Sequence, residues 1–152
     1  MPSYAIHLAA ALKYLESHTE NDIAAFLEGA LAPDLLEKPA SHYGPKSSAP
    51  GLELCIADRG LSDCFNRGYY FHLYTDMKFY NEFLPRFVSA FSREIYNDYD
   101  NIIRAIIDRY GVEIPDEIKD TVGFSEGEPK IIPLEALFEF IDSFKDETNI
   151  FY

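Results

Sequence analysis

Apolar and small residues recur at helical spacing from the start of the chain. In the first such segment they share one face while polar residues fall elsewhere, and the apolar face contains Tyr4, Leu8, Ala11, Leu12 and Leu15. A second segment follows Asn21, a good N-cap residue, and is expected to end at Pro33. The pattern predicts two amphipathic helices.

Residues 39–60 show little hydrophobic periodicity. Turn-forming residues are concentrated there: Pro39, Gly44, Pro45, Ser47, Ser48, Pro50, Gly51 and Gly60. We expect a long loop between the second and third helices. Because a loop of this length in a compact domain is usually functional or mobile, it is a candidate lid over a site.

Helical spacing returns after the loop. Ser62 can cap a third helix, which is rich in aromatic residues and is kinked or ended by Pro85. A fourth helix is expected to begin at Asn97 or Asp98, to carry a regular series of isoleucines and to stop at Gly111.

Proline marks the start of the last helical segments. Pro115 and Pro133 each stand where the first position of a helix tolerates proline. Apolar residues follow the second of these at helical spacing: Leu134, Leu137, Phe138, Ile141 and Phe144. No alternating strand pattern competes. The sequence predicts an all-α fold, a helical bundle of five or so helices in a single domain over residues 1–152.

The charge balance limits the partners. With 13 Lys and Arg against 26 Asp and Glu, the formal net charge is −13, while a hydrophobic content of 47% excludes a disordered acidic tail. Negative charge repels phosphate backbones, and no cluster of Lys or Arg offsets it, so we expect no nucleic-acid partner. The pattern leaves the oligomeric state open.

The sequence also indicates a compartment. The opening residues lack the basic region of a signal peptide, and no apolar run approaches the roughly 18 residues of a membrane span. Cys55 and Cys64 are too few for a disulfide framework, so both are expected to stay reduced. We expect a cytoplasmic protein without a membrane span.

The candidate chemistry starts with His72 and Asp76. They are four residues apart, which places both side chains on one face of a helix, where a single metal ion can bind both. The alternative is a His–Asp hydrogen bond without a metal. Phe71, Phe79 and Tyr80 indicate that this helix faces the core, where a carboxylate beside a neutral imidazole is costly unless a cation pairs with it. This surrounding favours the metal.

Three other residues extend the donor set. His7 lies on the apolar face of the first helix, Asp34 follows the second helix and His42 lies in the loop. Each has an ordinary role when taken alone, as a core histidine, a turn aspartate and an exposed loop histidine. Together they supply the nitrogen and oxygen donors that zinc and similar divalent metals take, so the candidate set is His7, Asp34, His42, His72 and Asp76.

Two observations narrow the interpretation: one concerns the kind of metal site, and the other excludes His18 from it. The absence of cysteine favours a hydrolytic site over a structural zinc knot. His18 stands eleven residues after His7, roughly 16 Å further along the helix axis, so it cannot share an ion with His7.

The order of these residues resembles a known family. His7 is followed by Pro-Asp at 33–34, by Ser-His at 41–42 and by a Gly-Tyr-x-x-His-x-x-x-Asp helix at 68–76. The chain is similar to the bacterial zinc-dependent phospholipases C, which share an all-α fold with the single-strand-specific zinc nucleases, and most closely to the short cytosolic members. The resemblance implies one zinc ion among Asp34, His42, His72 and Asp76. It also implies that Asp76 bridges to a second ion held by His7.

The chain departs from that family in its later ligands. Secreted members place a further zinc on a histidine after the helix aspartate, whereas this chain has no histidine after His72 and carries Glu82 six residues beyond Asp76. Secreted nucleases also use the amino terminus as a ligand, five residues before their first histidine, and Pro2 stands five residues before His7.

Two functional hypotheses follow. In the first, the chain is a metal-dependent hydrolase of a small-molecule or lipid phosphate ester, with a metal-activated water as nucleophile and Asp34 orienting that water or taking its proton. The cofactor is zinc, as one or two ions, or another divalent metal. In the second, favoured by the missing ligands, the chain is a metal-stabilised but catalytically inactive binding or sensor module.

Overall fold

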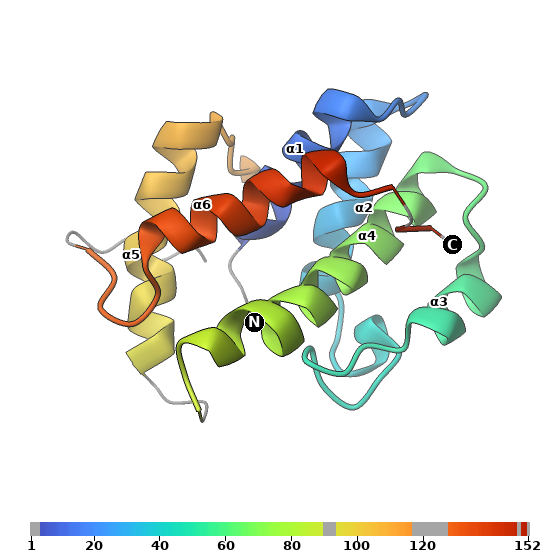
Figure 1. Ribbon diagram of the computed structural model, residues 1–152. Coiled ribbons are helices and arrows are strands. Elements are labelled where there is room, and N and C mark those ends of the chain that lie inside the picture. Colours follow the sequence, from blue (N-terminus) through green and yellow to red (C-terminus); the bar gives the residue numbers. More distant parts are fainter. Residues whose placement is uncertain (1–3, 90–93, 117–127, 149, 152) are drawn as a thin grey trace.

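The computed structural model describes residues 4–89, 94–116, 128–148 and 150–151. Its main elements are α1 (Tyr4–Ser17), α2 (Ile23–Leu35), α3 (Leu52–Arg59), α4 (Cys64–Lys78), α5 (Glu94–Tyr110) and α6 (Leu134–Asp142). The only extended pairing among these described residues is an isolated bridge between Lys46 and Ala49, so the all-α prediction is confirmed. In Figure 1, α4 and α6 run between α5 at one end of the molecule and α3 at the other.

Helix α2 is longer than the sequence predicts. The Asp22 carboxylate, rather than Asn21, caps it by accepting the N–H of Ala25 at 3.0 Å. The helix then continues through Pro33 to Leu35, so the prediction that it ends at Pro33 is wrong. Residues 29–33 are all buried, and this packing offsets the hydrogen bond that proline cannot donate. The two added residues are Asp34 and Leu35.

The predicted loop over residues 39–60 is partly helical. Ala40–His42 form a 3-10 turn, and α3 occupies the second half. The pattern missed α3 because Cys55 is its one buried residue while Leu54 is 62% exposed, so its apolar residues do not mark a buried face. The segment between the 3-10 turn and α3 forms a loop whose ends are joined by a hydrogen bond, which the Gly51 N–H donates to the His42 carbonyl at 3.0 Å.

Helices α2 and α4 are in direct backbone contact at two glycines. A Cβ atom on Gly29 would lie 2.0 Å from the carbonyl oxygen of Phe65, and one on Gly68 would lie 2.0 Å from that of Phe26. No other residue fits at either position without moving a helix backbone. The contact brings the last turn of α2 against the middle of α4, which is where the candidate ligands lie.

This close approach predicts an unusual response to Gly29→Ala. Alanine favours a helix by about 1 kcal/mol over glycine. We nevertheless expect the variant to be less stable by about 1–3 kcal/mol, because the added methyl group overpacks the α2–α4 contact. Urea unfolding measures the difference. Glu28→Ala, at an exposed neighbouring position, should change stability by less than about 0.5 kcal/mol, and a stabilised Gly29→Ala would contradict the contact.

The ends of α4 and α5 differ in detail from the predictions. Asp63, rather than Ser62, caps α4 by accepting the Asn66 N–H at 2.8 Å. Beyond Lys78 the chain continues as a π-helix over Phe79–Phe83 and a 3-10 turn over Leu84–Arg86, so Pro85 does lie where the regular helix has ended.

Helix α5 begins at Glu94, so the prediction that Asn97 or Asp98 caps it is wrong. The Asp98 carboxylate has another role. Inside α5, it accepts the backbone N–H groups of Lys130, Ile131 and Ile132 at 2.9, 2.8 and 2.8 Å and so fixes the chain before α6. Gly111 has a φ of 67° and ends α5 as predicted.

The prolines of the final segments have different outcomes. Pro133 occupies the N-cap position, one residue before α6. The helix expected after Pro115 lies largely outside the described residues.

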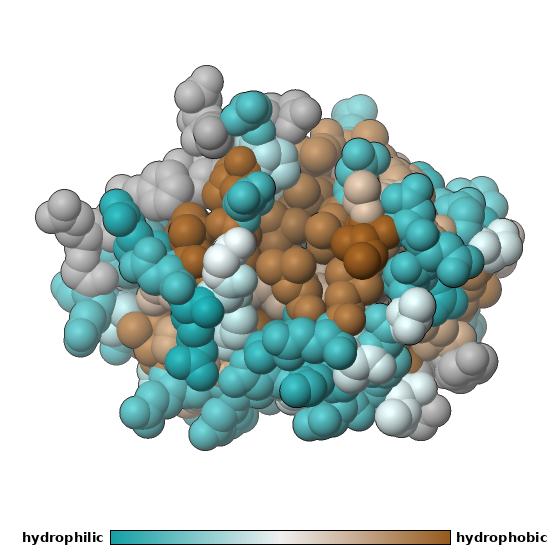
Figure 2. Space-filling model, turned by 90° about the horizontal axis from the view of Figure 1, so that it is seen from above, coloured by the Kyte–Doolittle hydropathy of each residue, from teal (hydrophilic) through white to brown (hydrophobic). Residues whose placement is uncertain are grey.

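One face of the molecule is apolar at its centre. Figure 2 shows this area bordered by hydrophilic residues. A cavity of about 320 Å³ lies between α1, α2 and the residues after α5, and leucines line much of it: Leu8, Leu12, Leu27 and Leu31.

Among the described helices, none combines the length and the apolar character that a membrane crossing needs.

Candidate metal centre

The structure brings all five predicted side chains together. His7 projects from α1, Asp34 from the last turn of α2, His42 from the 3-10 turn, and His72 and Asp76 from successive turns of α4. None of the five side chains is more than 1% exposed. Residues from four separate segments thus form one buried polar cluster, which we call the metal centre.

Asp76 lies in the middle of the metal centre. Its Oδ1 atom is 3.1 Å from Nε2 of His7, and its Oδ2 atom is 3.1 Å from Nε2 of His42 and 3.3 Å from Nε2 of His72. One carboxylate therefore contacts all three imidazoles. The exposed fraction of its side chain is 0%.

Asp34 lies at the edge of the metal centre, with longer contacts. Its Oδ1 atom is 3.4 Å from Nε2 of His72 and 3.5 Å from Nε2 of His42, and its Oδ2 atom is 3.9 Å from Nε2 of His7. Its Oδ1 atom also lies 3.1 Å from the ammonium of Lys38, whose side chain is 35% exposed. Asp34 thus links the buried cluster to a partly exposed lysine.

Hydrogen bonds on the far side of two imidazoles leave their Nε2 atoms facing the carboxylates. Nδ1 of His72 donates to the Ala30 carbonyl at 2.6 Å, and Nδ1 of His42 lies 2.9 Å from the Ser41 hydroxyl. With the proton on Nδ1, each Nε2 presents a lone pair, as a metal-bound histidine does.

The polar atoms of the centre lack hydrogen bonds, although Oδ1 of Asp34 lies 3.1 Å from the Lys38 ammonium. Among the described residues, both oxygens of Asp34 and of Asp76 and the Nε2 atoms of all three histidines are buried without a hydrogen bond. Buried polar atoms are rarely left so, because the desolvation is not compensated. Facing lone pairs in a buried site are compensated either by a proton on an imidazole or by a cation between them, so the group could hold a metal ion.

The spacing of these atoms fits a bound divalent ion. Two ligands about 2.0–2.1 Å from a tetrahedral zinc ion lie roughly 3.3 Å apart. The contacts of Asp76 with the three histidines, and those of Asp34 with His42 and His72, span 3.1–3.5 Å. The donor set, its burial and its spacing all match what a divalent metal needs.

The donors divide into two overlapping triads. The described residues give one group of His7, His72 and Asp76 and another of Asp34, His42 and His72. His72 belongs to both, but its Nδ1 is occupied and its single free nitrogen can bind one ion. The described donors therefore complete one metal site, and a second ion would retain only His7 and Asp76 from these groups.

In the metal-free centre, the carboxylates favour the protonated forms of His72 and His42. Burial opposes a charge on His72, but the carboxylates of Asp34 and Asp76 outweigh it and raise its pKa to about 10. Burial likewise opposes the charge on His42, yet contacts with the same carboxylates raise its pKa. Burial and the positive charge on His72, whose ring stacks 3.6 Å away, lower the pKa of His7.

The two carboxylates respond to the same charges. Burial alone would raise the pKa values of Asp34 and Asp76, but the imidazolium of His72 and contacts from the other histidines hold both well below the ordinary range. Without a metal, the centre is therefore a carboxylate–imidazolium cluster.

The stability of the metal-free protein and the strength of metal binding should depend on pH in opposite directions. In the metal-free protein, the contribution of His72 is fully present below its unfolded pKa of 6.5 and is lost as the pH rises towards 10. His42 acts in the same sense. His7, whose pKa is lowered, acts in the opposite sense: its burial costs stability at low pH, and this cost disappears as the pH rises through 6.5. In the metal-bound protein the histidines must be neutral, so metal binding strengthens as pH rises.

We therefore expect the Tm difference between zinc-loaded and chelator-treated protein to widen from about pH 6 to about pH 8. With free zinc at 100 times its Kd, the ion stabilises by about 2.7 kcal/mol, which corresponds to about 5–10 °C at this chain length. Scanning calorimetry measures both forms. A difference that narrows with rising pH would contradict the assignment.

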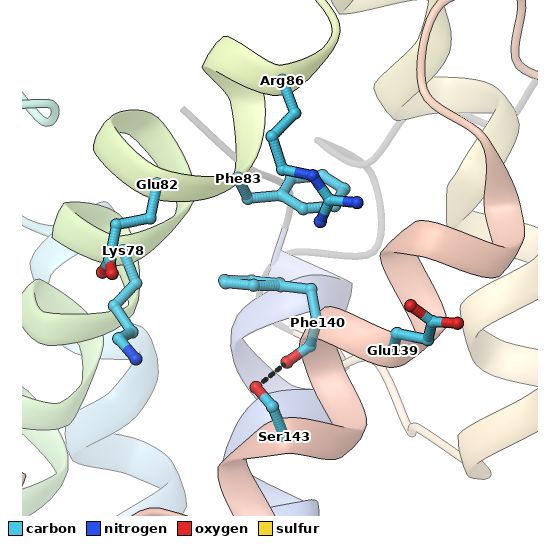
Figure 3. A pocket seen from close by; sticks show the side chains of 7 residues that line it. All are labelled: Lys78, Glu82, Phe83, Arg86, Glu139, Phe140 and Ser143. Atoms are coloured by element: carbon cyan, nitrogen blue, oxygen red, sulfur yellow. Dashed lines mark hydrogen bonds between the residues drawn. The ribbon is translucent and has the colours of Figure 1, made fainter.

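His18 and Glu82 lie outside the centre. Nδ1 of His18 lies 3.0 Å from the Tyr14 carbonyl at the end of α1, away from His7. Glu82 is exposed and lines a groove with Lys78 and Arg86, where the rings of Phe83 and Phe140 lie 5.0 Å apart (Figure 3). Neither belongs to the triads, and Pro2 lies outside the described residues.

Lys38 also lies at the site, although the sequence pattern did not predict it. It follows Asp34 by four residues, the spacing of an ion pair on a helix, and this was the signal that could have found it. Together with Lys46 and His42 it lines a cavity of about 320 Å³ beside the metal centre. The cavity therefore adjoins one residue of the metal centre, His42.

Comparisons with known protein families, with curated proteins and with solved structures give no match.

Proposed function

We propose that the protein is a metal-dependent hydrolase of phosphate esters, of the phospholipase C-like type that its motifs resemble. One observation carries the proposal. Nε2 atoms of three histidines and the carboxylates of Asp34 and Asp76 converge, buried and without hydrogen bonds, at the spacing of zinc ligands. Zinc is the metal we propose, as one ion held by His42, His72 and Asp76, with His7 and Asp34 beside it.

A bound divalent ion would lower the pKa of a coordinated water from 15.7 to about 7 and so supply hydroxide near neutral pH. The residues have separate tasks. Asp76, which contacts all three histidines, is the central ligand. Asp34 makes longer contacts and pairs with Lys38, which lines the cavity, so it is the carboxylate we propose to orient the attacking water and accept its proton.

The opening at Lys38 supports access for an anion. The chain as a whole has a formal net charge of −13, which repels phosphate at long range. At the cavity, however, two lysines stand beside the metal centre. A phosphate ester that reaches this opening meets positive charge before it meets the buried donors.

A second function is favoured by the burial of the centre. All five donor side chains are at most 1% exposed, as in structural metal sites, which are closed to solvent. A metal-stabilised binding module without catalysis fits that observation. The two functions differ in one property, namely whether the bound metal can reach a substrate.

Metal content and turnover together decide between these functions. We expect the purified protein to hold one zinc ion per chain by atomic emission and to hydrolyse p-nitrophenyl phosphate or bis-p-nitrophenyl phosphate until a chelator removes the ion. Tightly bound zinc without hydrolysis of either substrate would support the module. Absence of bound metal after incubation with zinc would mean that the histidines and aspartates interact without an ion.

A further inference from the structure

A buried hydroxyl joins the 3-10 turn that carries His42 to α4. The Tyr69 O–H, from α4, donates to the carbonyl of Ser41, the residue before His42. Tyr69 is 1% exposed and Ser41 is 6% exposed, so bulk water does not compete for this hydrogen bond. Among the described residues, no other hydrogen bond joins the turn to α4.

Tyr69 shares a helix face with two of the candidate metal ligands. It precedes His72 by three residues and Asp76 by seven, which is the spacing of one face of an α-helix. The same face of α4 therefore carries two ligands and the hydroxyl that holds the turn with a third, His42. Because Nε2 of His42 lies 3.1 Å from Oδ2 of Asp76, a small shift of the turn changes the geometry of the metal centre.

The Tyr69 ring is itself held in place. The guanidinium carbon of Arg59 lies 3.8 Å from the centre of the ring, and the Arg59 Nε donates to the Tyr43 hydroxyl at 3.1 Å. The rings of Tyr43 and Tyr69 meet edge to face, with 6.2 Å between their centroids. Burial raises the pKa of Tyr69 to about 12, so the hydroxyl keeps its proton and donates throughout the neutral range.

His42 depends on such support more than the other histidines of the metal centre do. His7 and His72 lie within regular helices, whereas His42 ends a turn of three residues, Ala40–His42. A turn this short has few hydrogen bonds of its own and cannot fix the direction of a side chain as a long helix does.

We propose that Tyr69 is a positioning residue of the metal centre, which holds His42 at the place where it can bind the same ion as His72 and Asp76. This inference rests on the metal centre of the proposed function and adds to it a residue that does not touch the ion. Because Tyr69 acts through His42, its effect on metal binding should disappear when the imidazole is absent.

The test is a double-mutant cycle in zinc affinity, measured by competition with a zinc-sensitive dye. Tyr69→Phe removes the hydroxyl and keeps the buried ring, and it should weaken zinc binding about 10–100-fold, the usual cost of changing a residue that orients a metal ligand. In a His42→Ala background, the same change should alter the affinity by less than about twofold, because the positioned imidazole is gone.

Tyr74→Phe is the matched control for this cycle. It also removes a hydroxyl from α4, but that hydroxyl donates to Glu147 at 3.3 Å and not to the 3-10 turn. Its zinc affinity should stay within about twofold of the wild type, the range expected for independent sites.

The visible absorption of bound Co²⁺ gives a second readout, since it reports the geometry of the ligands around the ion. At saturating Co²⁺, Tyr69→Phe should absorb more weakly than the wild type, because a displaced His42 leaves the ion less tetrahedral. A residue that only stabilises the fold would leave the spectrum of the filled site unchanged. The spectrum is recorded on the metal-loaded form, so it applies even if the metal-free variant is poorly folded.

An equal loss of zinc affinity with and without His42, or a wild-type cobalt spectrum in Tyr69→Phe, would overturn the inference. A wild-type protein that binds neither zinc nor cobalt would remove the metal centre, and the proposed function and this inference would both be wrong. Zinc affinity that depends on Tyr69, without hydrolysis of either phosphate ester, would remove the enzyme and support the positioning role.

Discussion

Replacing Asp76 by asparagine is expected to weaken zinc binding more than 100-fold. Even residues that only orient metal ligands cost 10–100-fold when changed, and Asp76 contacts all three histidines at 3.1–3.3 Å. The asparagine keeps the shape of the side chain but removes the charge that a divalent ion needs. Competition with a zinc-sensitive dye measures the affinity.

The same variant should lose the thermal response to zinc. Its Tm with zinc should equal its Tm with a chelator, because an ion that is not bound cannot stabilise the folded state. Asp108→Asn makes the same chemical change at an exposed position of α5 and should retain wild-type zinc affinity. If Asp76→Asn bound zinc as the wild type does, Asp76 would not be a ligand.

Asp34→Asn is expected to reduce turnover by about 10²–10⁴-fold, the usual contribution of a general base. An amide cannot accept the proton of the attacking water at neutral pH. The loss of zinc should be smaller than in Asp76→Asn, because the Asp34 oxygens lie 3.4–3.9 Å from the histidine nitrogens. Steady-state rates at saturating zinc separate the two effects.

Saturating zinc is the condition that makes the Asp34 result decisive. With the site filled, a variant that retains turnover within tenfold of the wild type would exclude Asp34 as the base. The exposed variant Asp108→Asn again serves as the control, and its rate should not change. A rate that is low at limiting zinc and reaches the wild-type rate at saturating zinc would show that Asp34 acts only as a ligand.

Much of the fold could be predicted from the period of apolar residues. Helices α5 and α6 each bury one face, and this burial leaves the helical pattern that the sequence shows. In α1 and α4 every side is buried over residues 5–11 and 68–73. Helix α3 left no such pattern, because only Cys55 in it is buried. The end of α2 was placed too early, since packing around Pro33 overrides the local effect of proline.

The metal centre was predictable because histidine and aspartate are rare in apolar helix faces. His72 and Asp76 share a helix, so their spacing alone places them together. The approach of His7, Asp34 and His42 depends on tertiary packing, above all on the glycine contact between α2 and α4, and the sequence indicated it only through the family motif. The lysine cavity forms where the end of α2 meets the segment before α3, and helical periodicity contains no trace of it.

Anomalous diffraction at the zinc edge, on crystals of zinc-loaded protein, tests the central claim most directly. It locates each bound zinc ion independently of any assay. The account predicts a strong peak between the carboxylate of Asp76 and the Nε2 atoms of His42 and His72, about 2.0–2.2 Å from each ligand atom. Fully occupied zinc elsewhere, or no peak among these side chains, would contradict it.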